Sequence, residues 1–192
     1  MKLNIEKCYE LFKKYIFIIF VLNNSLFVNI SLGKNLSSQE IKSLEVIAKN
    51  GNTDAQLKLG KNALIHIKPP DYATAAFWFK KASKSGNMEA KELLAAQKLS
   101  GLGTPPDLPG ALSLFKEAAN SGSPNAQASL GVMYAIGAGV KKDKVNAYAW
   151  LTIAAYNGLK EARTKRDNSV LPGMTAAEVE QAIKLAESFL KK

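Results

Sequence analysis

The stretch that decides the fold is LGVMYAIGAGVKKDKVNAYAWLTIAAYNG, residues 130–158. It holds a glycine-containing loop, a run of lysines, and then an almost unbroken apolar segment that ends in glycine. Such a loop is either a phosphate cradle or the hinge of a unit that recurs in the chain. A nucleotide-binding loop lies between a strand and the N-terminus of a helix. A loop that recurs at a fixed spacing along the chain is instead the hinge of a repeated unit.

The stretch recurs with a period of 36 residues. A fixed period of roughly 20 to 50 residues is the signature of a repeat architecture. The columns that share it are Asp71, Asp107 and Asp143; Ala75, Ala111 and Ala147; Ala82, Ala118 and Ala154; and Gly86, Gly122 and Gly158. An alanine column at 55, 90, 126 and 162 steps by 35, 36 and 36 residues. The loop is therefore a hinge, and the chain is predicted to be a series of structural repeats.

Each column has a structural role. The aspartates precede apolar runs, where a carboxylate accepts backbone N–H groups of the first helical turn and stabilises the helix by about 1 kcal/mol. The glycines follow the runs, at the position where a helix ends in a left-handed turn. Two tryptophans share a column of large side chains that is predicted to be core. The positions assigned to the repeat framework are Gly60, Gly86, Gly101, Gly103, Gly122, Gly131, Gly137, Gly139, Gly158, Trp78, Trp150, Asp71, Asp107 and Asp143.

The pattern predicts an all-α fold, an α-solenoid of stacked antiparallel helix pairs with a C-terminal capping helix. Ahead of it, Lys13 and Lys14, a short apolar run at 15–22, and small residues at Ser31 and Gly33 indicate a secretory signal peptide. The predicted organisation is a signal peptide over 1–33, an N-terminal helix and linker over 34–54, three repeats over 55–161 (55–89, 90–125 and 126–161), and a C-terminal half-repeat with its capping helix over 162–192.

The signal peptide bears on location and charge. Cleavage after Gly33 predicts a secreted or periplasmic protein of the cell envelope. An uncleaved anchor and a buried N-terminal helix stay open, although this short run is well below the roughly 20 apolar residues that span a bilayer. Cys8 would leave with the signal, so no disulfide is expected. Removing four lysines and two glutamates lowers the formal charge from +10 to +8, which favours acidic partners or reflects an ordinary lysine-rich surface.

The third repeat follows the pattern A-x-x-x-L-G-x-x-Y-x-x-G-x-G-V, then D, then A-x-x-W-L-x-x-A-A-x-x-G. This pattern resembles the Sel1-like repeat family, which is tetratricopeptide-like, and the closing segment is similar to that of bacterial secreted members. The second repeat departs from it with Ala95 and Leu114, and the first with His66 and Lys68 in place of the loop glycines. The resemblance implies a helical solenoid with an adaptor or assembly role, in a bacterial envelope.

Few residues offer chemistry. His66 is the sole histidine and the mature chain has no cysteine, so neither a metal nor a cofactor is expected. Ser113-x-x-Lys116 and Ser188-x-x-Lys191 match the S-x-x-K signature of serine-lysine hydrolases, but no S-D-N or K-T-G accompanies them. The expectation is a protein that is not an enzyme. Because secreted relatives have been associated with penicillin binding, a serine-lysine hydrolase or penicillin-binding activity stays open as an alternative.

Binding of a polyanion by basic residues is another alternative. The basic groups are Lys80, Lys81 and Lys84; Lys141, Lys142 and Lys144; and Arg163, Lys165 and Arg166. No aromatic residue is expected among them on an exposed face, and a secreted protein rarely meets nucleic acid. Nucleic acid is therefore not an expected partner.

The expected function is a protein–protein interaction scaffold or adaptor in the cell envelope. The first helices of the pairs would line an inner face that binds segments of partner proteins. Membrane contact is expected only through the signal segment, if it is not cleaved. By helical period, the less buried positions of these helices, and so the predicted partner-binding residues, are Lys58, Lys61, Asn62, Lys91, Gln97, Lys98, Gln127, Ser129 and Met133.

Overall fold

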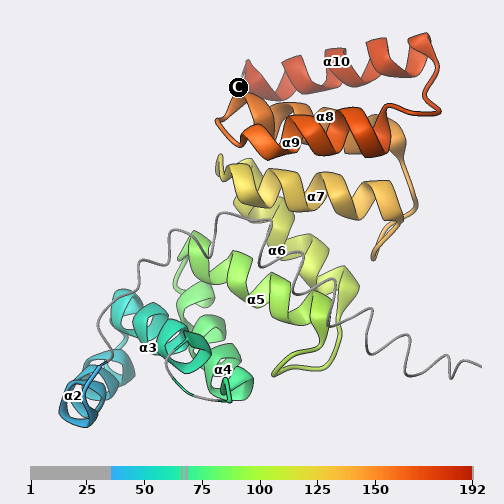
Figure 1. The fold of residues 1–192 in the computed structure, drawn as a ribbon. Helices are drawn as coiled ribbons and strands as arrows, with labels where there is room; N and C mark the ends of the chain where they lie inside the picture. The colour runs from blue at the N-terminus through green and yellow to red at the C-terminus, as the bar shows by residue number, and fades with distance from the viewer. Residues whose placement is uncertain (1–35, 66, 68, 192) are drawn as a thin grey trace, which may run out of the picture. The chain divides into compact units, whose positions relative to one another are not determined.

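Helices make up all the regular structure in the described part of the chain. The computed structural model describes residues 36–65, 67 and 69–191, so the predicted signal segment, His66 and Lys68 lie outside the described residues. The elements are α2 (Ser38–Lys49), α3 (Thr53–Ile65), α4 (Tyr72–Lys84), α5 (Met88–Ser100), α6 (Leu108–Asn120), α7 (Pro124–Ile136), α8 (Lys144–Tyr156), α9 (Lys160–Lys165), the π-helical turn η1 (Arg166–Val170) and α10 (Ala176–Leu190) (Figure 1). The predicted all-α class of paired helices is confirmed. None of the described helices has the length and apolar character that a membrane span requires.

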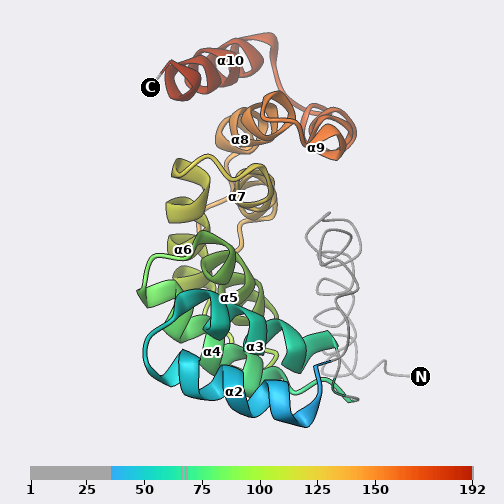
Figure 2. The same ribbon diagram turned by 90° about the vertical axis from the view of Figure 1, so that its left-hand side faces the viewer.

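The helices fall into two compact units, α2 to α5 before Leu108 and α6 to α10 from Leu108 onward. In the first unit, α3 packs between α2 and α4, and α4 also packs on α5. In the second unit, α7 packs between α6 and α8, and α8 also packs on α9, η1 and α10. Within each unit, Figure 2 shows these helices stacked side by side. Helices α4 and α8, each the second of its pair, thus contact several others, which gives their large side chains an apolar environment.

An aspartate stands directly before the second helix of the first repeat and before that of the third. Asp71 before α4 and Asp143 before α8 each accept, through Oδ1, the backbone N–H three residues later at 2.9 Å. These bonds satisfy donors that the first turn of a helix leaves unpaired, and the carboxylate also meets the positive end of the helix dipole. Asp107 immediately precedes α6, and its carboxylate pairs with Lys98 Nζ at 2.5 Å.

The cap at Asp71 makes stability depend on pH. The backbone N–H of Thr74, and then its hydroxyl, hydrogen-bond this carboxylate and lower its pKa below the ordinary 3.8. Because the folded pKa is the lower one, the stabilisation is complete above the unfolded pKa and is lost as pH falls through the folded pKa.

We expect Asp71→Asn to be less stable than wild type near neutral pH, since asparagine keeps an acceptor oxygen but not the charge. The difference between the two free energies of unfolding should shrink as the pH is lowered to about 3. Urea unfolding followed by circular dichroism at a series of pH values measures this difference. A constant difference over that range would contradict the assigned role of the charge.

The two tryptophans are buried in separate clusters. Trp78 packs with Ala48, Ala55 and Leu59, so its cluster joins α2, α3 and α4. The ring centroid of Trp150 on α8 lies 4.6 Å from that of Phe189 on α10. The column after the tryptophans is also buried and consists of Phe79, Phe115 and Leu151. These side chains form the apolar interior of each unit.

Glycines in the first helices allow the second helices to come close. A Cβ atom at Gly60 would overlap the ring of Phe79, and one at Gly131 would lie 2.8 Å from Leu151 Cγ. Phe79 and Leu151 occupy the same column of the repeat, so the two contacts are equivalent. Helix α3 therefore approaches α4, and α7 approaches α8, more closely than a larger residue would allow.

In the second and third repeats, the second glycine of the loop contacts the start of an earlier helix. Gly103 and Gly139 have φ angles of 76° and 69°. A Cβ atom at Gly103 would overlap the carbonyl of Tyr72 in α4, and one at Gly139 would lie 2.7 Å from the carbonyl oxygen of Leu108 in α6. Both the left-handed backbone and the close approach require glycine. These loops therefore hold the helix pairs in register.

Candidate partner-binding surface

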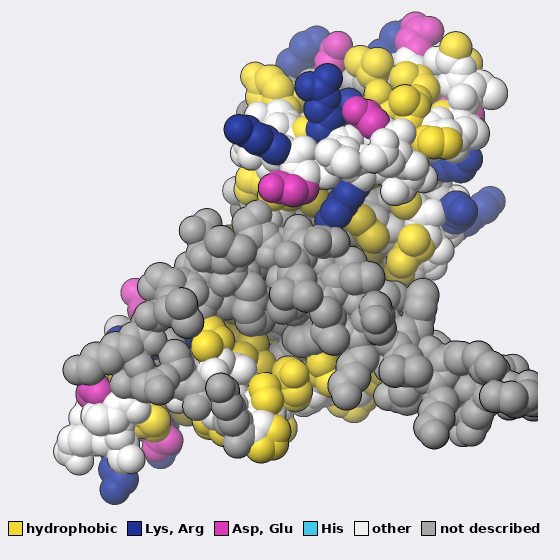
Figure 3. All heavy atoms as spheres, in the orientation of Figure 1, with side chains coloured by type: hydrophobic (Ala, Val, Ile, Leu, Met, Phe, Trp, Pro, Cys, Tyr) yellow, Lys and Arg dark blue, Asp and Glu magenta, His cyan; other side chains and the backbone are white. Residues whose placement is uncertain are grey.

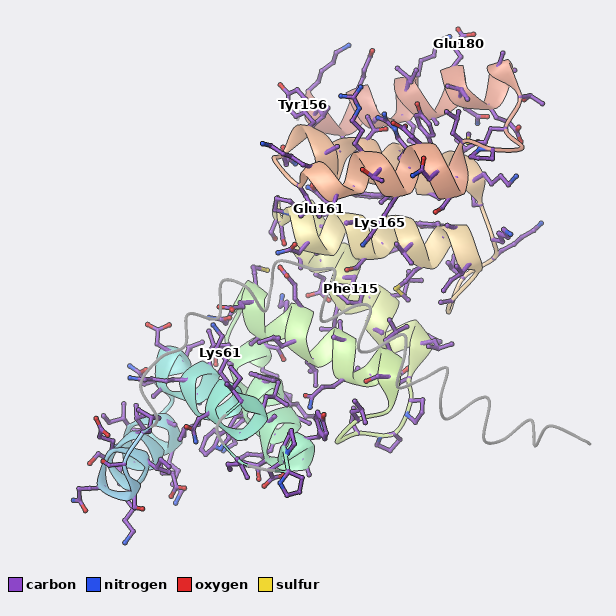
Figure 4. The ribbon with its side chains drawn as sticks, viewed as in Figure 1. Lys61, Phe115, Tyr156, Glu161, Lys165 and Glu180 are labelled. Carbon is purple, nitrogen blue, oxygen red and sulfur yellow. The ribbon has the colours of Figure 1, made fainter. Side chains whose placement is uncertain are left out.

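The first helices α3, α5 and α7 carry the predicted partner-binding residues. Of the nine, Lys58 is exposed, and Lys61, Lys91 and Lys98 are partly exposed. Lys61 Nζ on α3 lies 2.5 Å from Glu89 Oε1 on α5. This ion pair joins the two first helices of the first unit, and Figure 4 shows Lys61 on α3. Of the nine predicted residues, the accessible ones are therefore all lysines, and all of them lie on α3 and α5.

The predicted exposure is wrong for the other five residues. Asn62, Gln97, Gln127, Ser129 and Met133 are all buried. The physical reason is that neighbouring helices cover these side chains. Helix α3 packs between α2 and α4, α5 packs on α4, and α7 packs between α6 and α8. The exposed stripe of a first helix is therefore narrower than the helical period alone indicated. Whether any of the nine residues binds a partner stays a prediction.

Two of the buried glutamines hold neighbouring helices together. Gln97 Nε2 donates to the carbonyl of Tyr72 at 2.9 Å, which ties α5 to the first turn of α4. Gln127 Nε2 donates to the carbonyl of Ala119 at 3.1 Å, and its Oε1 accepts from Asn157 Nδ2 at 2.9 Å. Gln127 thus links α7 to the ends of α6 and α8. These hydrogen bonds explain why amides occupy buried positions.

Gln56 is a structural residue that sequence reasoning missed. It occupies the same column as Gln127, and its Nε2 donates to the carbonyl of Ala48 at the end of α2, at 2.9 Å. In both cases the acceptor lies eight residues earlier in the chain. A glutamine directly after the column alanine in the first and third repeats was the signal that pointed to this bond.

The first unit contains buried amide oxygens without a hydrogen-bond partner. Among the described residues these include Asn62 Oδ1 on α3 and Gln97 Oε1 on α5. A buried acceptor left without a donor costs roughly 1–3 kcal/mol. The two residues belong to one column of the repeat, so both first helices of this unit carry an unused acceptor at the same position.

In the second unit, basic residues of α9 and η1 are engaged within the fold. The guanidinium of Arg166 lies 5.0 Å from the ring centroid of Tyr148, and its Nη1 donates to Thr152 Oγ1 at 3.2 Å. Lys165 is partly buried; burial lowers its pKa, and the carboxylate of Glu161 one turn earlier opposes the shift. Figure 4 shows Lys165 and Glu161 together on α9. On the face in Figure 3, basic side chains of this unit are interspersed with acidic and apolar ones.

The family profile of the Sel1 repeat matches residues 53–87, 89–123 and 124–159. These segments make up more than half of the chain. The chain belongs to the Sel1 repeat family. Each matched segment corresponds to one helix pair, so the Sel1 repeat is the structural unit that the columns define. The predicted family is confirmed.

Two solved structures with Sel1-type repeats are similar to this chain. One is a protective antigen present in uropathogenic Escherichia coli strains and displaying an SLR fold, with a TM-score of 0.73 and 26% identity; the match covers 97% of this chain and 39% of that chain. The other is a Sel1 repeat protein from Oxalobacter formigenes, with a TM-score of 0.58 and 29% identity, covering 68% of this chain and 98% of that chain. This chain thus spans about two fifths of the antigen's length. Among curated proteins no significant match is found.

Neither serine-lysine pair of this Sel1 repeat protein is joined by a hydrogen bond between described residues. Near Ser113, the Lys116 ammonium lies over the ring of Tyr134, 5.9 Å from its centroid. Ser188 Oγ donates to the carbonyl of Leu185 in its own helix at 2.7 Å. In the described ranges, no group of three or more His, Cys, Asp or Glu residues is placed to hold a metal ion. The geometry gives the hydrolase alternative no support.

One aromatic residue does lie beside a basic group, contrary to the prediction. Phe77 on α4 is 52% exposed, and Lys81 Nζ lies 4.8 Å from its ring centroid. The sequence FWF places three aromatic residues in a row, and only Trp78 and Phe79 fall on the buried side of the helix. An amphipathic helix turns adjacent residues to different sides, so the third aromatic faces solvent.

Proposed function

We propose that this Sel1 repeat protein is a non-enzymatic scaffold of the cell envelope that binds segments of partner proteins along α3 and α5. Sel1 repeat proteins generally are protein-interaction scaffolds. The observation that supports this particular surface is that the accessible residues among those predicted, Lys58, Lys61, Lys91 and Lys98, all lie on these two helices.

An extended, acidic segment of a partner protein fits this surface best. Its carboxylates pair with Lys58, Lys61 and Lys91, which are exposed or partly exposed. Recognition through charge needs no catalytic residue, and the net positive charge of the chain steers the encounter with an acidic segment.

The combined replacement of Lys58, Lys61 and Lys91 by glutamate is expected to weaken partner capture at least about tenfold. Each exposed ion pair contributes roughly 0.2–1 kcal/mol, and each reversal also turns attraction into repulsion. The measurement is a crosslinked pull-down from an envelope extract, with captured proteins identified by mass spectrometry and then titrated.

The matched control carries three reversals at exposed lysines of the second unit, Lys141, Lys142 and Lys160. It has the same net charge as the test variant and should capture the partner like wild type. Unchanged capture by the test variant, or an equal loss in the control, would refute binding at α3 and α5.

The envelope location rests on the sequence alone, on Lys13, Lys14, the apolar run that follows and the small residues at Ser31 and Gly33. Fractionation of the source cells should place the protein outside the cytoplasm. N-terminal sequencing of the mature protein should begin at Lys34. A cytoplasmic chain that retains its first residue would overturn this part of the proposal.

A further inference from the structure

The outward side of α4 is a continuous basic and aromatic stripe. Its exposed residues are Ala73, Thr74, Phe77, Lys80, Lys81 and Lys84, and the buried ones are Ala75, Ala76, Trp78, Phe79, Ala82 and Ser83. The spacing of three and four residues puts the exposed set on one side of the helix. We define Phe77, Lys80, Lys81 and Lys84 as the α4 stripe.

The core does not require an aromatic residue at Phe77. One period later the same column holds Ser113 on α6, which is also exposed. The Phe77 ring instead makes an edge contact with Trp78, at 5.0 Å between centroids, and lies under the ammonium of Lys81. The ring therefore leaves about half of its surface in water, at a position where the second repeat has serine.

Two of the three stripe lysines also differ from their repeat equivalents, whereas Lys80 corresponds to Lys116. Lys81 and Lys84 correspond to Glu117 and Asn120 on α6, which has a mixed outer side. Helix α4 contains no acidic residue. In the described part of the chain, none of the three stripe lysines forms an ion pair with an acidic side chain. Their positive charge is therefore uncompensated locally.

We propose that the α4 stripe docks on an anionic phospholipid surface. The ring of Phe77 enters the boundary between headgroups and acyl chains, and the lysine stems lie beside it with their ammonium groups at the lipid phosphates. The lysines attract anionic lipid without a fixed geometry. This membrane contact is additional to the signal segment and independent of partner binding at α3 and α5.

A lipid surface suits the stripe better than an acidic peptide does. Recognition of a peptide requires hydrogen-bonding groups at fixed positions or a pocket for a side chain. The exposed set on α4 offers only a methyl group, one hydroxyl, an aromatic ring and three flexible ammonium groups. The hydroxyl of Thr74 already bonds Asp71 Oδ2 at 2.7 Å. A flat, mobile array of phosphates needs nothing more from the protein.

The test is flotation of the full chain with vesicles of phosphatidylcholine alone or with added phosphatidylglycerol. The apolar N-terminal segment contributes to binding on both, so the readout is the ratio of the two partition coefficients. Each lysine near an anionic surface contributes about fivefold, so the pair Lys80→Gln and Lys84→Gln should lower this ratio about 25-fold. Phe77→Ser, which installs the residue of the equivalent column, should lower binding to the anionic vesicles about fivefold.

The matched control is Lys141→Gln with Lys142→Gln, which removes two exposed lysines elsewhere and should leave the ratio unchanged. Circular dichroism melts check that each variant folds; if Phe77→Ser does not fold, the lysine pair decides alone. Equal partitioning of wild type on both vesicles, or an equal drop in the control, would overturn the proposal. A second contrary result concerns poly-glutamate. If the lysine variant loses binding to poly-glutamate but keeps the wild-type vesicle ratio, the stripe recognises acidic protein and the proposal fails.

Discussion

Replacing Trp150 by alanine is expected to lower the free energy of unfolding by about 3–5 kcal/mol, the range found when a large buried aromatic is truncated. The side chain is 5% exposed and its ring packs on Phe189. Its loss removes the ring contact with Phe189, which joins α8 to α10, and leaves a cavity between these helices. Urea unfolding followed by circular dichroism gives the free energy directly. Limited proteolysis should show earlier cleavage in the segment before α10.

Tyr156→Ala is the control on the same helix. Tyr156 is 74% exposed, so its truncation should change stability by no more than about 0.5 kcal/mol. A loss at Trp150 that is no larger than the loss at Tyr156 would mean that α10 does not depend on the tryptophan column. The cluster assigned to the second unit would then be incorrect.

Gly139→Ala should also be strongly destabilising, by about 2–5 kcal/mol, from two contributions. Placing alanine in the left-handed region costs roughly 1–2 kcal/mol. In addition, the new Cβ would lie 2.7 Å from both the carbonyl carbon and the oxygen of Leu108. That neighbour is backbone at the start of α6, which yields only if the helix moves, and overpacking of this kind costs about 1–3 kcal/mol.

Gly122→Ala separates the two contributions. Gly122 also has a positive φ, 93°, but a Cβ atom there would meet nothing within 4 Å. Its replacement should therefore cost only the conformational part, about 1–2 kcal/mol. Urea unfolding of both variants measures the difference. Equal losses at the two glycines would show that the contact between Gly139 and Leu108 does not constrain the loop.

Local signals made the fold predictable from the sequence. Asp71 and Asp143 stand directly before apolar runs and Gly158 directly after one, and these residues act on the backbone within a few positions of themselves. The period of 36 residues then repeats the same helix pair. Both signals are independent of how the helices pack, so the helix starts and the all-α class follow without coordinates.

Burial on the first helices was less predictable, because it depends on neighbours that sequence spacing does not specify. Gln97 and Met133 share a column that the helical period assigns to the surface, and both lie under adjacent helices. The methionine in this column, Met133, was a sequence signal for burial, since methionine is more often buried than exposed. Phe77 shows the opposite error. Its repeat equivalents are Ser113, which is exposed, and Ala149, which is buried, so the column alone does not decide exposure.

The hydrogen bond from Asn157 to Gln127 gives the chain a point of chemical ageing. Asn157 is followed by Gly158, and an asparagine before glycine is open to attack on its own amide by the next backbone nitrogen, which releases ammonia and leaves a cyclic imide. Water then opens the imide to a carboxylate. The carboxylate so formed has no hydrogen to offer, and it would face the oxygen of Gln127. Prolonged storage in warm solution should therefore loosen the link between α7 and the end of α8, accompanied by a more acidic band on isoelectric focusing.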